Sequence, residues 1–297
     1  MIKIKIPATS ANLGPGFDTL AIAWKLFLHI KIDPSYYGKE IIYNTKSQQI
    51  KEEDNLFLKA LNRTLELIGY SPKNYLIELD SEIPIGKGLG SSATVIWGGI
   101  FSAEILAKKE LSMHDRFKIA YSLENHLDNL SASYFGGLTI CTMENNNPKI
   151  VKFPYPDELC GVIYIPPYSL PTEKARKLLP KLYERDKVVY NLQSLAFLLS
   201  GFLYKDENLL TLGIRDSIHQ PYRFPLISEV NIIKKKINDL GGIGIVLSGA
   251  GPSLLTFALK EKAIKIKSGL EEFIKKEGLK GEVLLLEICK EGIIIEK

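Results

Sequence analysis

The chain has 297 residues and a formal net charge of +4, and 45% of its residues are hydrophobic. This length exceeds that of a usual single core, so we expect two domains. No block of lysine and arginine is dense enough to predict a nucleic-acid or membrane partner, and no apolar run approaches the roughly 18 residues of a membrane span. Because Cys141, Cys160 and Cys289 lie far apart, we expect reduced thiols. We expect a cytoplasmic protein, because Met1 is followed by an alternating strand instead of a signal peptide.

The first 32 residues predict two strands on either side of a shaped loop. Residues 2–6 alternate between isoleucine and lysine, which is typical of a half-buried strand, and we expect this strand to end at Pro7. Residues 8–18 follow as a loop with a stiff Gly-Pro-Gly centre. Its Asn12 and Asp18 side chains suit either ligand contact or turn formation. Residues 24–32 predict the second strand.

Three helices are predicted in the middle of the first half. One begins after Asn55, because the apolar residues from Phe57 to Ile68 follow the helical period and Gly69 closes the segment. Asn55 fits an N-cap, and it fits contact with a purine equally well. The apolar segment after Thr94 predicts a helix to about residue 109. Residues 112–115 then form a capping-box pattern, and the helix that follows carries Glu124.

A glycine-rich stretch that runs into the second of these helices predicts an anion site. Its glycines permit positive φ angles and a close approach of the backbone to a ligand, and the first helical N–H groups lack partners inside the helix. Such a helix start can bind phosphate, and Ser91 and Ser92 are placed to assist a cation. The stretch consists of Pro84, Ile85, Gly86, Lys87, Gly88, Leu89, Gly90, Ser91, Ser92, Ala93 and Thr94.

Three other interpretations apply to this stretch. The Walker pattern is rejected because Lys87 lies between glycines with no hydroxyl after it. A dinucleotide fingerprint fits Gly88 to Ala93 loosely, but residues 76–80 alternate between apolar and charged residues, unlike a buried parallel strand. A plain glycine-rich turn before a core helix stays open.

Residues 124–129 gather Glu124, His126, Asp128 and Asn129 between an apolar helix and a segment of small residues. Burying carboxylates without partners costs several kcal/mol, so a cation, a substrate hydroxyl or both would explain the cluster, as would a solvated loop. No histidine or cysteine spacing predicts zinc. Mg²⁺ held by one carboxylate, one serine hydroxyl and phosphate oxygens fits better.

The chain changes character near residues 154–156, where we place a boundary between domains 1–155 and 156–297. Beyond it the patterns predict strands at 161–165, 243–247, 254–258 and 283–287, and helices at 188–204, 228–240 and 262–276, besides a helix capped by Thr172 that reaches Leu182. Without the extra helices this is the split β-α-β-β-α-β order. Residues 248–253 are small enough to let another loop approach, or are only a hairpin turn. Arg176 and Arg223, taken singly, fit surface groups.

Taken together, these segments resemble the signature motifs of the GHMP small-molecule kinases, and most closely those of the homoserine kinases. The pattern Pro-x-Thr-Ser-Ala-Asn-Leu-Gly-x-Gly-Phe-Asp of that family is met in full by residues 7–18, and the resemblance continues through residues 172–176 and 220–223. It implies an α+β, two-domain fold with a ribosomal protein S5 domain 2-like N-terminal domain and a ferredoxin-like C-terminal domain. It also implies ATP-dependent phosphorylation of L-homoserine, a step in threonine biosynthesis, and is compatible with a homodimer.

The resemblance also implies roles for particular residues. ATP would lie on residues 84–94 with Gly249 and Gly251, with Asn55 near the adenine, and Mg²⁺ would be held by Ser92 and Glu124. Catalysis would involve Asp128, Glu124 and Ser92. Asp18 can offer a carboxylate to the ammonium of homoserine, and Arg176 and Arg223 can offer guanidinium groups to its carboxylate. The full set expected around homoserine is Asn12, Asp18, His126, Asp128, Asn129, Arg176 and Arg223.

Two departures from the family pattern leave alternatives open. The family commonly has Gly and Pro where this chain has Asn125 and Leu127, which affects the conformation of that loop. In related mevalonate kinases a lysine of the first motif assists the catalytic aspartate, and no lysine lies between Pro7 and Leu20 here. Whether Asp128 removes the hydroxyl proton or only orients it is therefore open. The rival functions are another GHMP kinase, of mevalonate or shikimate type, and a non-catalytic nucleotide-binding sensor.

Overall fold

Two β-sheets organise the computed structural model, which describes residues 1–44 and 55–296. Within these ranges the first sheet has seven strands, in the order β11-β1-β2-β4-β3, and β2 also pairs with β5, which pairs with β6. The β3–β4 pair is parallel. The strands are β1 (Ile2–Ala11), β2 (Leu20–Asp33), β3 (Lys39–Tyr43), β4 (Tyr75–Ser81), β5 (Leu138–Glu144), β6 (Asn147–Phe153) and β11 (Ile294–Glu296).

The first strand is longer than the sequence predicts. The prediction that it ends at Pro7 is wrong, because β1 continues to Ala11. The register between β1 and β2 shifts between Pro7 and Ala8. Such a bulge tolerates proline, which has no N–H to give to the ladder. The extension brings Thr9 to the glycine-rich stretch, where its backbone N–H donates to the carbonyl of Leu89 over 3.1 Å.

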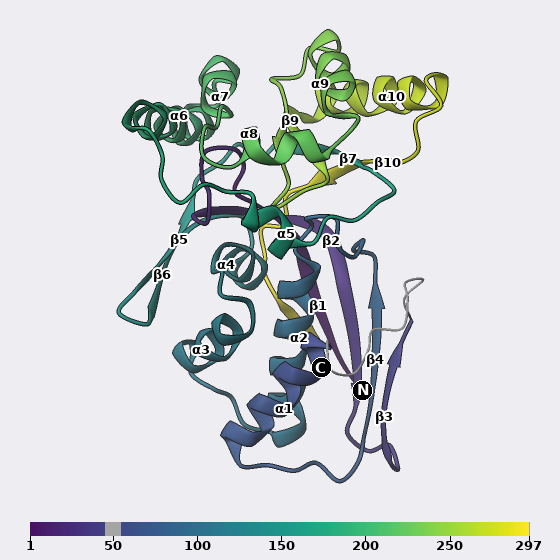
Figure 1. Ribbon diagram of the computed structural model, residues 1–297. Coiled ribbons are helices and arrows are strands. Elements are labelled where there is room, and N and C mark those ends of the chain that lie inside the picture. The colour runs from purple at the N-terminus through teal and green to yellow at the C-terminus, as the bar shows by residue number, and fades with distance from the viewer. Residues whose placement is uncertain (45–54, 297) are drawn as a thin grey trace.

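In the described part of the first half, four helices pack beside the strands of its sheet (Figure 1). The predicted caps are confirmed: Asn55 accepts the N–H of Leu58, Ser112 accepts that of Asp115, and Gly69 adopts φ 73°. The last helix is not predicted by the sequence, and it begins at Asp128 inside the polar cluster. The helices are α1 (Leu56–Ile68), α2 (Ser91–Ala107), α3 (Met113–Glu124) and α4 (Asp128–Phe135).

The second sheet has the order β10-β7-β9-β8, and its pairs are antiparallel. Helices α9 and α10 pack against it. This is the split β-α-β-β-α-β arrangement, which confirms the predicted α+β fold with a ferredoxin-like second unit. The chain leaves the first sheet at Phe153, and the boundary at residue 155 stays a prediction. The elements are β7 (Leu159–Ile165), β8 (Val246–Leu247), β9 (Leu254–Leu259), β10 (Glu282–Glu287), α9 (Val230–Asp239) and α10 (Lys260–Lys276).

Between β7 and α9 the chain forms α5 (Thr172–Lys177), α6 (Arg185–Tyr204), α7 (Glu207–Gly213), α8 (Gln220–Arg223) and the short η2 (Phe224–Leu226). The prediction of a helix capped by Thr172 and reaching Leu182 is wrong. The cap residue is Pro171, and α5 ends at Lys177. Pro180 explains the early end, because proline lacks an N–H and clashes with the preceding turn. The strand predicted at 243–247 is also shorter, since only Val246 and Leu247 pair with β9.

The two halves share one apolar core. The same cluster contains Trp24 of β2, Ile163 of β7 and Phe257 of β9. Gly161 of β7 faces Trp24 so closely that a Cβ there would lie 2.7 Å from the indole ring. The strand β11 returns the chain to the first sheet, and the two termini lie close together in Figure 1. No helix in the described ranges is both long and apolar enough to cross a membrane.

Candidate active site

A cavity of about 420 Å³ is lined by residues from both halves of the chain. The structure brings together in its walls most residues that the sequence singles out. Five predicted residues do not line it, namely Pro84, Lys87, Leu89, Ala93 and Gly251. Those that do are Asn12, Asp18, Asn55, Ile85, Gly86, Gly88, Gly90, Ser91, Ser92, Thr94, Glu124, His126, Asp128, Asn129, Arg176, Arg223 and Gly249.

The glycine-rich stretch forms one end of the cavity. Gly86, Gly88 and Gly90 adopt φ 69°, 78° and 71°, which side chains with a Cβ rarely take. Gly90 precedes α2 and makes no side-chain cap, so the first turn of α2 keeps its N–H groups for a ligand. A phosphate group is the ligand that such a helix start favours, because the N–H groups and the helix dipole both attract negative charge.

The loop at residues 248–251 packs directly on this stretch, as its small residues predict. Ser248 Oγ donates to the carbonyl of Gly88 over 2.6 Å. A Cβ on Gly88 would lie 2.1 Å from the carbonyl oxygen of Ser248, so this approach requires glycine. Ser10 Oγ lies 2.6 Å from Ser248 Oγ and accepts the indole N–H of Trp24 over 2.8 Å. The glycine-rich stretch is thereby fastened to both sheets.

Lys87 is directed away from the cavity. Its ammonium donates to the carbonyls of Pro166 and Tyr168, over 2.9 and 2.6 Å. Leu89 and Ala93 are buried in the core, 1% and 0% exposed. The side chains of these three residues are therefore not available to bind phosphate. Contact between ATP and their main-chain atoms stays a prediction.

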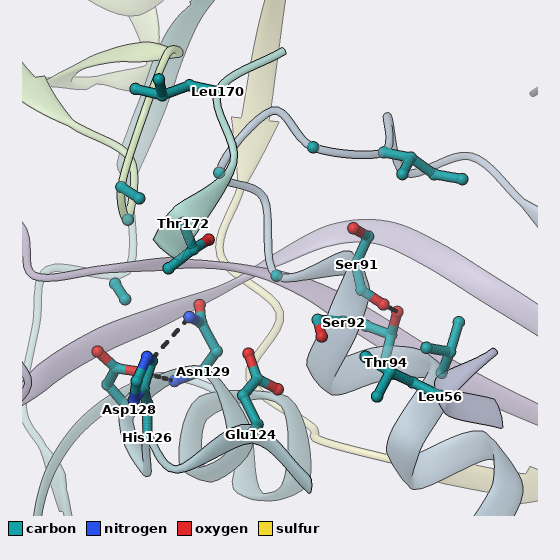
Figure 2. A pocket seen from close by; sticks show the side chains of 18 of the residues that line it. Leu56, Ser91, Ser92, Thr94, Glu124, His126, Asp128, Asn129, Leu170 and Thr172 are labelled. Atoms are coloured by element: carbon teal, nitrogen blue, oxygen red, sulfur yellow. Dashed lines mark hydrogen bonds between the residues drawn. The ribbon is translucent and has the colours of Figure 1, made fainter. Parts of the chain in front are cut away.

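The part of the cavity wall near α1 is largely apolar and includes Leu56 and Val95, and Figure 2 shows Leu56 beside Thr94. Asn55 keeps the cap role, since its Oδ1 accepts the N–H of Leu58 over 3.1 Å. Its Nδ2 donates to the hydroxyl of Tyr43 over 2.6 Å. Sequence reasoning missed Tyr43, because nothing in the pattern of β3 places it opposite Asn55. An apolar slot with an amide and a phenol beside it suits a nucleobase.

Two carboxyl groups with unusual proton affinity lie in the middle of the cavity. Burial raises the pKa of Glu124 to about 8, and the neighbouring Asp128 adds to the rise. Burial also raises the pKa of Asp128 to about 7, although the backbone N–H of Asn129 opposes it. Glu124 Oε2 is buried, and no residue in the described ranges forms a hydrogen bond with it. Because charge at these carboxylates is poorly compensated, a cation or a ligand hydroxyl would find a partner here.

These groups fit a magnesium ion that arrives with a nucleotide. Among residues 1–44 and 55–296, no group of three or more His, Cys, Asp or Glu side chains could hold a metal. An ion bound here would therefore need ligand oxygens besides the protein's own, as Mg²⁺ commonly does. In Figure 2, Ser92 and the carboxylate of Glu124 face the same space, beside Asp128 and Asn129.

The far end of the cavity carries both signs of charge. Asp18 pairs with Arg176, whose Nη1 donates to Asp18 Oδ2 over 3.0 Å. Two guanidinium groups contact the Phe17 ring, with the Cζ atoms of Arg176 and Arg223 each 5.3 Å from its centre. Arg223 is 1% exposed, although the sequence alone favours a surface group. The structure thus joins residues that are more than 200 positions apart.

Asn12 and Asn129 are already engaged by the protein. Asn12 Nδ2 donates to the carbonyl of Gly249, and its Oδ1 accepts the N–H of Asp18. Asn129 Oδ1 accepts the hydroxyl of Thr9 over 2.7 Å. Asn12 and Asp18 adopt φ 70° and 53°, so the loop that presents them is held in an uncommon conformation. His126 also lines the cavity, and burial lowers its pKa.

The fold and this cavity define an ATP-dependent small-molecule kinase, and comparison with known proteins identifies its family. Residues 55–137 match the model of the GHMP kinases N terminal domain, and residues 199–276 match that of the GHMP kinases C terminal domain. The chain belongs to the GHMP kinase family and, within it, to the homoserine kinases.

Relatives that match over nearly the full length show that the chain belongs to the homoserine kinases. The chain is 36% identical over 297 residues to a homoserine kinase of Aquifex aeolicus, covering 99% of both chains. It is 38% identical over 256 residues to one of Caldicellulosiruptor saccharolyticus, covering 86% of this chain and 83% of that one. The solved homoserine kinase of Cytophaga hutchinsonii is 27% identical, with a TM-score of 0.86 and coverage of 99% and 97%. A mevalonate kinase structure from Methanococcus jannaschii, 20% identical with a TM-score of 0.70, shares the fold; coverage is 97% and 98%.

Proposed function

We propose that this kinase transfers the γ-phosphoryl group of ATP to the side-chain hydroxyl of L-homoserine. The products are ADP and O-phospho-L-homoserine, an intermediate on the way to threonine. The observation that supports the proposal most strongly is that one end of the cavity has both acidic and basic side chains. Asp18 provides a negative group, and Arg176 and Arg223 provide positive groups, in the same walls as Glu124 and Asp128. An amino acid has both charges, whereas mevalonate and shikimate have only a carboxylate.

The nucleotide occupies the other end of the cavity in this proposal. The phosphates bind the main-chain N–H groups of the glycine-rich stretch and of the first turn of α2. The adenine lies in the apolar slot beside Asn55 and Tyr43. Ser92 and Glu124 would hold Mg²⁺, which when bound neutralises charge on the phosphates. The orphaned oxygen of Glu124 supports this assignment.

The chemical step needs alignment and a place for one proton. The hydroxyl oxygen of homoserine forms a bond to the γ-phosphorus while the bond from that phosphorus to the β,γ-bridging oxygen breaks, and ADP leaves. Asp128 orients the hydroxyl and accepts its proton, and its pKa of about 7 suits a proton acceptor at neutral pH. His126 and Asn129 contact the substrate beside it. A strong base is unnecessary, because phosphoryl transfer depends chiefly on positioning and electrostatics.

Substrate binding exchanges one ion pair for two. Asp18 and Arg176 pair with each other in the structure. A zwitterion entering between them gives its ammonium to Asp18 and its carboxylate to Arg176 and Arg223. Charge-assisted hydrogen bonds are worth about 1.5–3 kcal/mol each, enough in pairs to exclude an alcohol without the amino-acid head group.

A coupled ADP assay across homoserine, mevalonate, shikimate and galactose tests the proposal. We expect rapid ADP formation with homoserine alone, and a phosphate monoester of homoserine in the ³¹P spectrum of the product. Asp128→Asn should slow that reaction by orders of magnitude. Preferred turnover of mevalonate or shikimate would assign another GHMP kinase activity. Absence of turnover with every alcohol, together with measurable ATP binding, would favour a nucleotide-binding sensor.

A further inference from the structure

His219, which the proposed mechanism leaves unused, lies directly behind the substrate end of the cavity. Its side chain is 0% exposed. The ring stacks on Phe17, with 5.2 Å between ring centres, and Phe17 belongs to the loop that presents Asp18. Burial of an imidazole in such a place requires partners for both ring nitrogens. The identity of those partners determines what the ring can do.

The two partners fix the protonation state of the ring. His219 Nε2 lies 2.8 Å from the carbonyl oxygen of Gly14, which can only accept, so Nε2 must carry a proton. His219 Nδ1 lies 3.1 Å from Nη1 of Arg223, which can only donate, so Nδ1 must present its lone pair. The ring is therefore neutral, with its proton on Nε2. Burial lowers the pKa of His219 to about 4, which agrees with that geometry, although nearby Asp216 opposes the shift.

Arg223 needs such a partner. Among the residues that the structure describes, no carboxylate forms an ion pair with Arg223. Besides the bond to His219, its side chain makes one long hydrogen bond within the described ranges, from Nε to the carbonyl of Ala175 over 3.4 Å. The guanidinium of Arg176 also lies against the Phe17 ring, and burial, with help from Arg176, lowers the pKa of Arg223 to about 10. A neutral acceptor can orient this guanidinium without neutralising the charge that a substrate carboxylate requires.

We propose that His219 is a positioning residue for substrate binding, which aims the guanidinium of Arg223 at the carboxylate of the amino-acid substrate through a neutral Nδ1. The same ring ties Arg223, from α8, to Gly14 in the loop that presents Asp18. It therefore sets the spacing between the group that binds the ammonium and one of the groups that bind the carboxylate. This inference rests on the proposed role of Arg223.

Two amide variants test the roles of Nδ1 and Nε2 of His219 separately. In His219→Asn the amide reaches about as far as Nδ1 and can accept from Arg223, while in His219→Gln it reaches about as far as Nε2 and can donate to Gly14. We expect His219→Gln to raise the KM for homoserine about tenfold or more, and His219→Asn to raise it less than about threefold. The kcat and the KM for ATP should change little in either variant. Thermal unfolding of both variants checks that they fold.

Equal KM values for homoserine in the two variants, or a loss in kcat with no change in KM, would overturn the inference. Arg223→Gln distinguishes its failure from that of the proposed function. If the KM for homoserine rises in Arg223→Gln but not in His219→Gln, the proposed role of His219 is wrong and that of Arg223 stands. If Arg223→Gln leaves this KM unchanged, the proposed roles of both residues are wrong. If neither histidine variant folds, ¹⁵N spectra of His219 in the wild-type protein show which ring nitrogen carries the proton. A proton on Nδ1, or on both nitrogens, contradicts the proposed geometry.

Discussion

The carboxyl groups of the cavity differ in whether the protein itself provides them with a partner. Glu124 has a buried oxygen to which no described residue hydrogen-bonds, and burial raises the pKa of Glu124 to about 8. Asp18, in contrast, already has a guanidinium partner in Arg176. The first carboxyl group is therefore destabilised when ionised without a ligand, and the second is satisfied without one. This contrast leads to different expectations for the two neutral substitutions.

Glu124→Gln should abolish most turnover and yet stabilise the ligand-free protein in alkaline solution. The folded carboxyl holds its proton more tightly than an ordinary glutamate of pKa 4.5. The stability due to that proton is present below about pH 4.5 and is lost as the pH rises through about 8. An amide avoids this loss, so at pH 8.5 the variant should unfold with a free energy roughly 1–3 kcal/mol higher than wild type.

Urea unfolding at about pH 5 and pH 8.5, without nucleotide or metal, measures that difference. The gain should shrink toward zero at the lower pH, where the wild-type carboxyl is also neutral. Glu66→Gln, at an exposed position of α1, serves as the matched control and should show no such trend. A variant no more stable than wild type at either pH would mean that Glu124 is not strained. Unchanged turnover at limiting Mg²⁺ would remove Glu124 from the proposed metal site.

Asp18→Asn should act on the substrate and much less on the nucleotide. Loss of one charge-assisted hydrogen bond to the ammonium corresponds to a rise in the KM for homoserine of roughly 10- to 100-fold. The KM for ATP should stay within a few-fold, because Asp18 lies at the other end of the cavity. Steady-state kinetics in both substrates measure this, with the exposed Asp80→Asn as control. Equal effects on both KM values would contradict a role confined to the amino-acid head group.

At the scale of elements, the glycine-rich stretch works as a loop fastened on three sides. Thr9 of β1, Ser248 of the small-residue loop and the carbonyls of Pro166 and Tyr168 all contact it. Such fastening holds the phosphate-binding N–H groups in place before the nucleotide arrives, which reduces the ordering cost of binding. Lys87 contributes to this function through its contacts with the second half of the chain.

Lys87→Met should loosen the stretch from the second half and leave two carbonyls without their donor. We expect a loss of roughly 1–3 kcal/mol in unfolding free energy and a several-fold higher KM for ATP, with a smaller change in the KM for homoserine. Chemical unfolding and initial-rate kinetics measure the two effects. Lys118→Met, at an exposed position of α3, is the control. If Lys87→Met weakens neither stability nor ATP affinity, the ammonium is not part of the fastening.

Local signals in the sequence predicted the elements better than the contacts between them. The caps at Asn55 and Ser112 and the glycines of the binding stretch follow from short-range rules, and they are confirmed. The continuation of β1 past Pro7 depends on a bulge against β2, and no pattern within residues 2–11 reveals it. Long-range packing also decides that Arg223 is buried. His219 escaped notice because an isolated histidine carries no spacing signal.

At the scale of the molecule, the cavity lies where the two sheets share a core. Trp24 belongs to the first sheet, packs against Gly161 and Phe257 of the second, and donates to Ser10. The C-terminal strand β11 adds a further link by pairing with β1. An interface this apolar and continuous makes independent unfolding of one half costly, because it would expose part of the common core.

We therefore expect the chain to unfold in one cooperative transition in spite of its two sheets. Far-UV circular dichroism should coincide with tryptophan fluorescence, which reports on Trp24 between the halves and on Trp97 in the first half. The calorimetric and van't Hoff enthalpies should agree. ATP with Mg²⁺ at about 100 times its dissociation constant should raise the whole transition by about 2.7 kcal/mol. Two resolved transitions, of which the nucleotide shifts only one, would show that each half stands alone, and that the shared core does not couple them.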